Sequence, residues 1–312
     1  MAGRMRKTFA AFSRRVNRTS IAGAVRGVFG DKLPQKWQGQ MQFCADGKTL
    51  ETVPLVRRAH VCIFIHGSSD TELGWQAPEG RLNFGDQLFV DFGAQPLYVR
   101  YNSGLSVAEN GIALARLMPE LLKVNTSVRR VTLIGHSMGG LVIHAAVYDA
   151  RARKMPWLKK VQSIFLLGTP HAGAPLAKLA EKGEQLLQFI PNPFTLMAAS
   201  VIGLRSKGLK DLSLGQKGIT SRDPVLLPHA KYIFIAGGLQ KKRGGFINRL
   251  IGDGMVRQPS ALPKGEGEQG LWRQIMSRVA KTADVRIETA GGVGHLALRH
   301  DPRVYALIAR HF

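Results

Sequence analysis

The 312 residues suffice for one large domain or two small ones, and the 45% of apolar residues can supply a substantial core. The 44 Lys and Arg outnumber the 21 Asp and Glu, which gives a net charge of +23. This charge favours anionic partners such as phospholipid surfaces, nucleic acid or acidic substrates. The sequence contains no Cys and His spacing typical of a zinc site and no stretch typical of a membrane-spanning helix.

Positive charge is concentrated in residues 1–36, which hold nine Lys or Arg and one acidic residue. Arginines interrupt every apolar run of this segment, so it lacks the apolar region of a secretory signal peptide. Two interpretations remain open: a disordered basic arm, or a basic amphipathic helix that lies on an anionic membrane. We expect the folded domain to span residues 37–312.

The two cysteines, Cys44 and Cys62, are expected to be free thiols. Cys62 lies in the apolar run HVCIFIHG, where a small apolar residue suits a buried strand. A disulfide between the two is therefore not expected.

Six short apolar runs predict strands at residues 60–67, 95–102, 129–136, 161–169, 231–238 and 283–291. Several are continuously apolar, which is typical of strands that are covered on both faces. Helical patterns lie between them, notably at residues 106–122 and 138–153. This alternation predicts an α/β fold with a mostly parallel central sheet and helices on both faces.

Three further segments complete the expected organisation. Residues 41–55 favour an antiparallel hairpin at the edge of the sheet, and residues 301–312 a closing helix with Asp301 as its N-cap. Between about residues 171 and 230 the alternation fails, and such a long insertion is usually a lid or cap over an active site. An apolar part of it, LLQFIPNPFTLMAASVIGL, fits either a lid or a pair of core helices.

The stretch GHSMG at residues 135–139 matches the pattern Gly-x-Ser-x-Gly between an apolar strand and a helix. In a nucleophile elbow the serine has a strained backbone, and a Cβ at either flanking glycine would collide with neighbouring backbone. The turn exposes the hydroxyl of Ser137, and the N-terminus of the following helix can stabilise negative charge beside it. The pattern predicts a nucleophilic serine.

A serine nucleophile needs a base, and the elbow predicts the chain order Ser, acid, His. His295 follows the last predicted strand in a glycine-rich loop, at the strand end where α/β proteins place their sites. We therefore expect His295 to be the base, with His300 as the alternative. His144, two turns along the elbow helix, is expected to pack or to point outward.

The acid is expected after the predicted strand at residues 231–238. Asp253, in the loop sequence LIGDGMV, has this position, and its flanking glycines allow a tight turn. Asp223 fits a turn more readily, and Asp284 begins the last strand. A turn role for Asp253 also remains open.

The negative charge that forms during acyl transfer needs two backbone donors. Gly67 follows the first core strand and permits close approach of its loop, so the N–H of Ser68 can join that of Met138. We expect the His66 side chain to brace this loop. We place His136 and His171 among the supporting residues.

Together these motifs resemble the lipase branch of the α/β-hydrolase superfamily over residues 55–312. The resemblance rests on FIHGSSD, LIGHSMGGLV, LLGTPHAGAPLA, GDGMV and GGVGHLAL, and it is strongest with bacterial relatives of the GPI inositol-deacylase α/β domain and with lipase-like esterases. It implies an α/β-hydrolase fold with a lid or cap insertion. A GPI-anchor substrate does not follow, because the match is to the hydrolase domain alone.

Residue by residue, the resemblance implies Ser137 as nucleophile, Asp253 as acid and His295 as base. It implies Ser68 and Met138 as the oxyanion donors. The implied activity is hydrolysis of carboxylic esters, of lipids or acylated substrates, through an acyl-serine intermediate without a metal or organic cofactor.

Three other functions remain open at this stage. A thioesterase or acyltransferase uses the same triad, and a non-catalytic adaptor of the same fold is a different class of protein. Nucleic-acid binding is disfavoured because the basic runs lack interleaved aromatic residues. We expect a cytoplasmic protein, and binding to the inner membrane face is the consequence of the second interpretation of the basic arm, which stays open beside the first. The sequence does not determine the oligomeric state.

Overall fold

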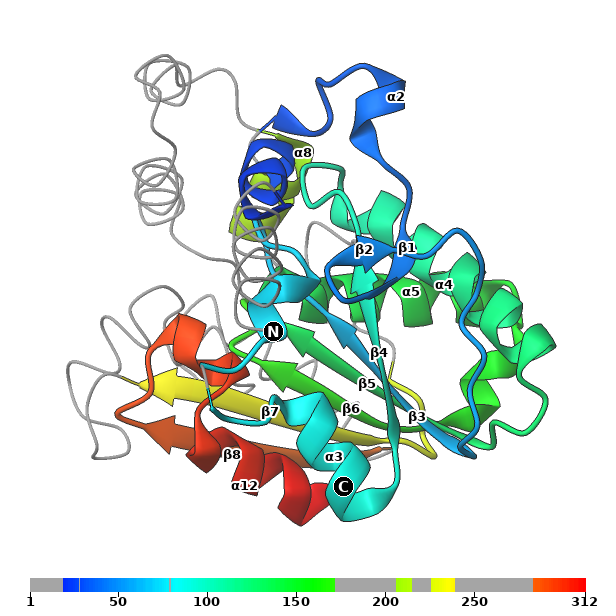
Figure 1. The fold of residues 1–312 in the computed structure, drawn as a ribbon, viewed down its shortest axis with the longest axis vertical. Coiled ribbons are helices and arrows are strands. Elements are labelled where there is room, and N and C mark those ends of the chain that lie inside the picture. Colours follow the sequence, from blue (N-terminus) through cyan, green and yellow to red (C-terminus); the bar gives the residue numbers. More distant parts are fainter. Residues whose placement is uncertain (1–18, 28, 79, 172–205, 215–225, 239–282) are drawn as a thin grey trace, which may run out of the picture.

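Eight strands form one twisted sheet in the order β2-β1-β4-β3-β5-β6-β7-β8 (Figure 1). The structure is a computed structural model that describes residues 19–27, 29–78, 80–171, 206–214, 226–238 and 283–312. The strands are β1 (Gln42–Ala45), β2 (Lys48–Thr49), β3 (His60–Ile65), β4 (Gln95–Arg100), β5 (Arg130–His136), β6 (Val161–Leu167), β7 (Lys231–Gly238) and β8 (Asp284–Gly291).

The sheet has a parallel part and an antiparallel edge. Strands β4, β3, β5, β6, β7 and β8 run parallel, whereas β1 pairs antiparallel with both β2 and β4. The six predicted parallel strands and the predicted edge hairpin are therefore confirmed. Because parallel strands end at one edge of a sheet, the loops after β3, β5, β6 and β8 lie together there.

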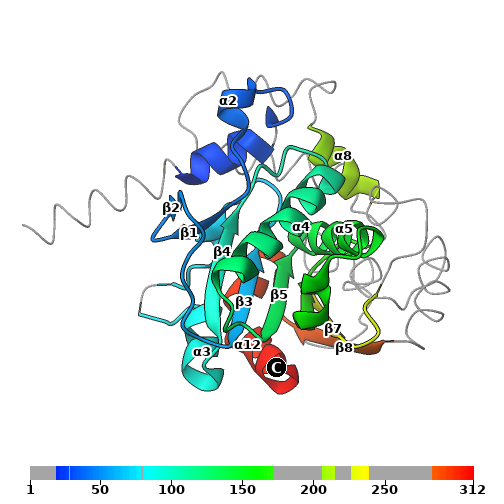
Figure 2. The same cartoon turned by 90° about the vertical axis from the view of Figure 1, so that its right-hand side faces the viewer.

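Helices cover both faces of the sheet (Figures 1 and 2). Among the described residues the helices with assigned bounds are α2 (Gln35–Gln38), α3 (Phe84–Phe92), α4 (Val107–Val124), α5 (Met138–Ala152), α8 (Lys207–Leu214) and α12 (Pro302–His311). The structure confirms the predicted cap of α12, where Asp301 accepts a hydrogen bond from the Arg303 N–H and Pro302 is the first helical residue. Helix α3, which begins at the N-cap Asn83, was not predicted from the sequence.

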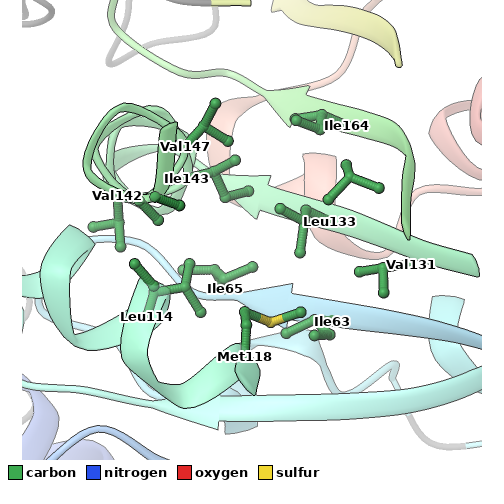
Figure 3. Close-up of a cluster of buried hydrophobic side chains, with 14 of the residues drawn as sticks. Ile63, Ile65, Leu114, Met118, Val131, Leu133, Val142, Ile143, Val147 and Ile164 are labelled. Atoms are coloured by element: carbon green, nitrogen blue, oxygen red, sulfur yellow. The ribbon is translucent and has the colours of Figure 1, made fainter. Parts of the chain in front are cut away.

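Each buried strand contributes to two cores, because successive side chains point to opposite faces. In β3, Ile63 and Ile65 pack with the residues of α4 and α5 (Figure 3). Cys62 and Phe64 point the other way and pack with those of α3 and α12. The continuous apolar runs of the sequence thus reflect a sheet that is buried on both sides.

Both cysteines are buried free thiols, as predicted. Burial raises the pKa of the Cys44 thiol to about 12 and also raises the pKa of Cys62. Neither thiol therefore forms a thiolate near neutral pH.

The basic N-terminal segment is described from residue 19 onward. Residues 19–27 are helical, and Ala24 in this helix is only 4% exposed because the helix packs on the domain. Residues 1–18 lie outside the described residues. So does most of the expected lid at residues 171–230, of which α8 is described.

None of the helices in the described ranges is both long and apolar enough to cross a membrane.

The close packing of α4 against α5 predicts that a Gly-to-Ala change at their contact destabilises the protein. Gly-to-Ala changes inside helices commonly stabilise a protein, by about 0.5–1 kcal/mol. A Cβ at Gly111 would instead lie 2.3 Å from the Cβ of Ala145. We expect Gly111→Ala to lower the free energy of unfolding by about 1–3 kcal/mol. Urea unfolding measures this change, with the exposed Arg116→Ala in the same helix as control; a stabilised G111A would contradict the close packing.

Candidate active site

The junction of β5 and α5 holds a strained serine. Ser137 has φ 54° and ψ −122°, a left-handed region that non-glycine residues rarely adopt. Its backbone N–H donates a hydrogen bond of 2.8 Å to the carbonyl of Leu167, at the end of β6. The neighbouring strand thus holds the turn in its strained form, as a nucleophile elbow requires.

The glycines around Ser137 are required by close backbone packing. A Cβ at Gly135 would lie 2.7 Å from the Gly140 nitrogen, and one at Gly139 would lie 2.3 Å from the Ile65 carbonyl oxygen. Both positions therefore exclude a side chain, as predicted from the motif. The elbow consequently packs directly against the end of β3.

The loop after β3 lies directly beside the serine. A Cβ at Gly67 would lie 3.2 Å from the Ser137 Cβ. Within the described part of the chain, the N–H of Ser68 has no protein acceptor. The N–H of Met138, the first residue of α5, has none within its own helix. Both N–H groups thus lie near Ser137 without a backbone acceptor in the described part of the chain.

The His66 side chain braces this loop, as expected from the sequence. Its Nε2 accepts a hydrogen bond from the Tyr101 N–H at 3.3 Å, so its Nδ1–H donates to the Gly67 carbonyl at 2.8 Å. The Tyr101 hydroxyl donates in turn to the His66 carbonyl, and the two rings stack 4.1 Å apart. Burial lowers the pKa of His66, so the brace is a neutral imidazole.

His295 begins the short 3₁₀ helix η4 (His295–Arg299) and is 2% exposed. Its ring lies beside Gly168, where a Cβ would be 3.0 Å from the His295 Nδ1. Gly168 directly follows Leu167, whose carbonyl holds the Ser137 N–H. The structure therefore brings the expected base and the expected nucleophile to the same edge of the sheet.

His136 connects the elbow to the His295 loop. Its Nε2–H donates a hydrogen bond of 3.0 Å to the His295 carbonyl, and the two rings lie 4.7 Å apart. The sequence placed His136 among the supporting residues without this contact. The only signal for it was its position inside the elbow motif.

An ion pair not predicted from the sequence joins the loop of Ser68 to the helix of His295. Asp70 pairs with Arg299, the last residue of η4. A side chain at Gly74 would occupy this space, since its Cβ would lie 2.3 Å from the Asp70 Oδ2. Two residues so distant in sequence gave no local signal for the pair.

The candidate acids divide into one that the structure excludes and two that it leaves open. Asp284 is exposed at the amino end of β8, opposite Lys231 in register, and pairs with Arg286. It therefore lies at the sheet edge opposite Ser137. Asp253 and Asp223 lie outside the described residues.

The alternative base, His300, is the C-cap of η4. Burial and the adjacent Arg299 lower the pKa of this imidazole.

Two further histidines pack behind the elbow. His144 in α5 and His171 after β6 are buried with ring centroids 5.3 Å apart. Burial lowers the pKa of His144 to about 4 and that of His171 well below its ordinary value. Both are therefore neutral core residues, and no group of His, Cys, Asp and Glu in the described ranges is arranged to hold a metal ion.

The sheet order, the elbow and the loop after β3 define the α/β-hydrolase fold. A family model described as PGAP1-like alpha/beta domain matches residues 111–211, about a third of the chain. These residues include the elbow and its helix. The resemblance expected from the motifs is thus supported by an independent family comparison.

Solved structures with this fold include the lipase BlEst2 of Bacillus licheniformis. Its mature form is 17% identical with a TM-score of 0.52, over 83% of this chain and 94% of that one. Its propeptide form is 18% identical with a TM-score of 0.54, over 83% of this chain and 51% of that one, so the present chain spans about half its length. Carboxylesterase CesB of Bacillus subtilis is 11% identical with a TM-score of 0.43, over 84% and 85% of the two chains. No curated protein matches the sequence.

The buried histidines predict a pH-dependent stability. His144 has a folded pKa of about 4, whereas an unfolded histidine titrates near 6.5, so between these pH values the unfolded chain binds more protons. Stability is therefore expected to fall as pH drops from 6.5 to 4, with about 3 kcal/mol of the loss due to His144.

Urea unfolding at several pH values tests this linkage. His144→Phe should reduce the slope of the free energy of unfolding against pH between pH 4 and 6.5. His229→Gln, at an exposed position, serves as the control. His60, whose pKa burial lowers to about 4, should leave a residual slope in H144F. Equal slopes for H144F and the wild type would refute the assignment.

Proposed function

We propose that the protein is a serine hydrolase that cleaves carboxylic esters through an acyl intermediate on Ser137. The observation that carries this proposal is the strained backbone of Ser137, which has φ 54° and lies directly beside the loop of Gly67. Such strain persists only where surrounding structure maintains it, and it clusters at functional sites. The α/β-hydrolase fold, which the lipase BlEst2 shares, supports this chemistry.

In the first half of the reaction His295 removes the proton of the Ser137 hydroxyl. The Oγ forms a bond to the ester carbonyl carbon, and the carbonyl oxygen becomes an oxyanion that accepts hydrogen bonds from the Ser68 and Met138 N–H groups. The tetrahedral species then collapses. The bond to the alcohol breaks, and His295 returns the proton to the leaving oxygen.

In the second half a water molecule replaces the alcohol. His295 takes one proton from this water, whose oxygen bonds to the acyl carbon and regenerates the oxyanion. Collapse releases the carboxylic acid, and the proton returns to Ser137. Asp253 orients His295 and stabilises its charged form in both halves.

The substrate that we propose is an ester of a lipid or of another acylated molecule. The net charge of +23 attracts anionic surfaces, and the basic residues that precede the packed helix at residues 19–27 supply a means of binding them. The mature lipase BlEst2 shares the fold over 83% of the chain. A lid within residues 171–230 would then open at a lipid surface.

The first experiment is labelling by a fluorophosphonate probe. We expect the wild type to be labelled and Ser137→Ala to remain unlabelled, with a fall in kcat of about 10³–10⁶-fold on p-nitrophenyl esters. Ser127→Ala, at an exposed serine on the far edge of the sheet, is the control. Undiminished labelling of S137A would overturn the assignment of the nucleophile.

The acid is assigned by comparing three aspartate variants. Asp253→Asn should lower kcat by about 10⁴-fold, because the base loses the group that fixes its tautomer. Asp284→Asn, at the opposite edge, should retain wild-type kcat, and so should Asp223→Asn. Full activity of D253N together with loss of activity in D223N would move the acid to residue 223.

The substrate class is tested with p-nitrophenyl esters of increasing chain length, with and without anionic vesicles. A lipase should prefer long chains and gain activity on phosphatidylglycerol vesicles, and salt should reduce this gain because it screens the charge. Neutral phosphatidylcholine vesicles are the control. Activity that is indifferent to chain length, vesicles and salt would refute a lipid substrate.

A further inference from the structure

The helix formed by residues 19–27 packs directly on the loop that contains Ser68. A Cβ at Gly27 would lie 2.5 Å from the Ser69 Cα and 2.7 Å from the Ser69 nitrogen. A Cβ at Gly23 would lie 2.6 Å from the Thr71 Cγ2 and 2.9 Å from the Asp70 carbonyl oxygen. Gly23 and Gly27 are four residues apart and therefore lie on one face of the helix. The helix and the loop thus meet backbone to backbone.

The helix is itself anchored to other parts of the domain. The Ser206 hydroxyl, buried just before α8, donates a hydrogen bond of 2.6 Å to the Gly27 carbonyl. The Asn102 side chain donates one of 3.2 Å to the Gly30 carbonyl. Gly104 has no room for a side chain, because its Cβ would lie 2.1 Å from the Arg26 carbonyl oxygen. The ribbon accordingly shows this blue helix beside α8 (Figures 1 and 2).

The loop under the helix is strained and has little room to move. Ser69 has φ 55°, a left-handed backbone in a non-glycine residue, and its N–H donates to the Ser103 hydroxyl at 3.0 Å. On the opposite side of the loop, the Cβ position of Gly67 is 3.2 Å from the Ser137 Cβ. The loop is therefore confined between the helix at Ser69 and the elbow at Gly67. Any shift at Ser69 also moves the adjacent N–H of Ser68.

We propose that the helix at residues 19–27 positions the oxyanion donor, with Gly23 and Gly27 as positioning residues for ester hydrolysis. This inference depends on the proposed function, because it assigns a task to the Ser68 N–H. The helix holds the strained loop against the elbow, so that the N–H points to where the oxyanion forms. Residues 19–27, which the sequence predicted to be part of a basic arm, thereby belong to the catalytic structure.

The proposal makes a quantitative statement about Gly27→Ala. The added methyl group displaces Ser69, and a displacement of about 1 Å at a reacting group costs about 100-fold in rate. We therefore expect kcat to fall about 10–100-fold with little change in KM. Affinity for a trifluoromethyl ketone, which forms an oxyanion on the serine, should fall in parallel.

A second, milder variant and its second-site rescue distinguish a positioning effect from a folding defect. Gly23→Ala should lower kcat about tenfold, because its methyl group meets the Thr71 Cγ2. Thr71→Ser removes that methyl group and retains the hydroxyl that caps η1 (Glu72–Trp75). The double variant G23A/T71S should recover part of the lost kcat, because the closest contact is removed while the one with the Asp70 carbonyl oxygen remains. A general loss of stability would not be rescued in this way.

Ala22→Val on the exposed side of the same helix is the matched control and should keep wild-type kcat. Thermal unfolding confirms that each variant is folded. Folded G23A and G27A with wild-type kcat and inhibitor affinity would overturn the proposal, as would an equal loss in A22V. If fluorophosphonate labelling of the protein does not depend on Ser137, the proposed function itself fails. If labelling depends on Ser137 but G27A keeps the wild-type kcat, only the role of the helix fails.

Discussion

The left-handed backbone of Ser137 is the constraint on which the arrangement of the site depends. A non-glycine residue in this conformation is unfavourable by about 1–3 kcal/mol, and the surroundings must offset that strain. The carbonyl of Leu167 does so by binding the Ser137 N–H. Gly135 and Gly139 do so by allowing β5, α5 and β3 to approach without side chains between them. The elbow is thus fixed by the neighbouring strands β3 and β6 as well as by the close packing of its own glycines.

The loops around the elbow are tied to one another as well as to the sheet. Tyr101 and His66 brace the loop of Ser68 from inside the domain. The pair between Asp70 and Arg299 joins that loop to η4. A site assembled from several loops requires such cross-connections, because each loop alone has too few contacts to hold sub-ångström geometry.

Much of this architecture was predictable from the sequence, and the limits of prediction have physical causes. Strands β3, β5, β6 and β7 are buried along almost their whole length, and strands buried on both faces are continuous apolar runs. Together with the partly buried β4 and β8, they were predicted within about two residues of their ends. The elbow was predictable because its glycines are adjacent in sequence to the serine that needs them. In contrast, the packing of residues 19–27 depends on loops near residues 70 and 103, and no local pattern reveals that Gly23 and Gly27 are contact points. The roles of Asp253 and of the insertion remain predictions, since both lie largely outside the described residues.

The two buried cysteines have a practical consequence for studying the rest of the molecule. Cys62 is fully enclosed between the two helical layers, and Cys44 is 6% exposed. With the thiol pKa of Cys44 near 12 and that of Cys62 also raised, neither sulfur presents a reactive thiolate to a maleimide near neutral pH. A single cysteine introduced at any exposed position can then carry a fluorophore or a spin label without prior removal of the native thiols. With a pair of introduced cysteines, one on α4 and one within residues 171–230, the distance between the two labels would test whether that segment responds to a lipid surface.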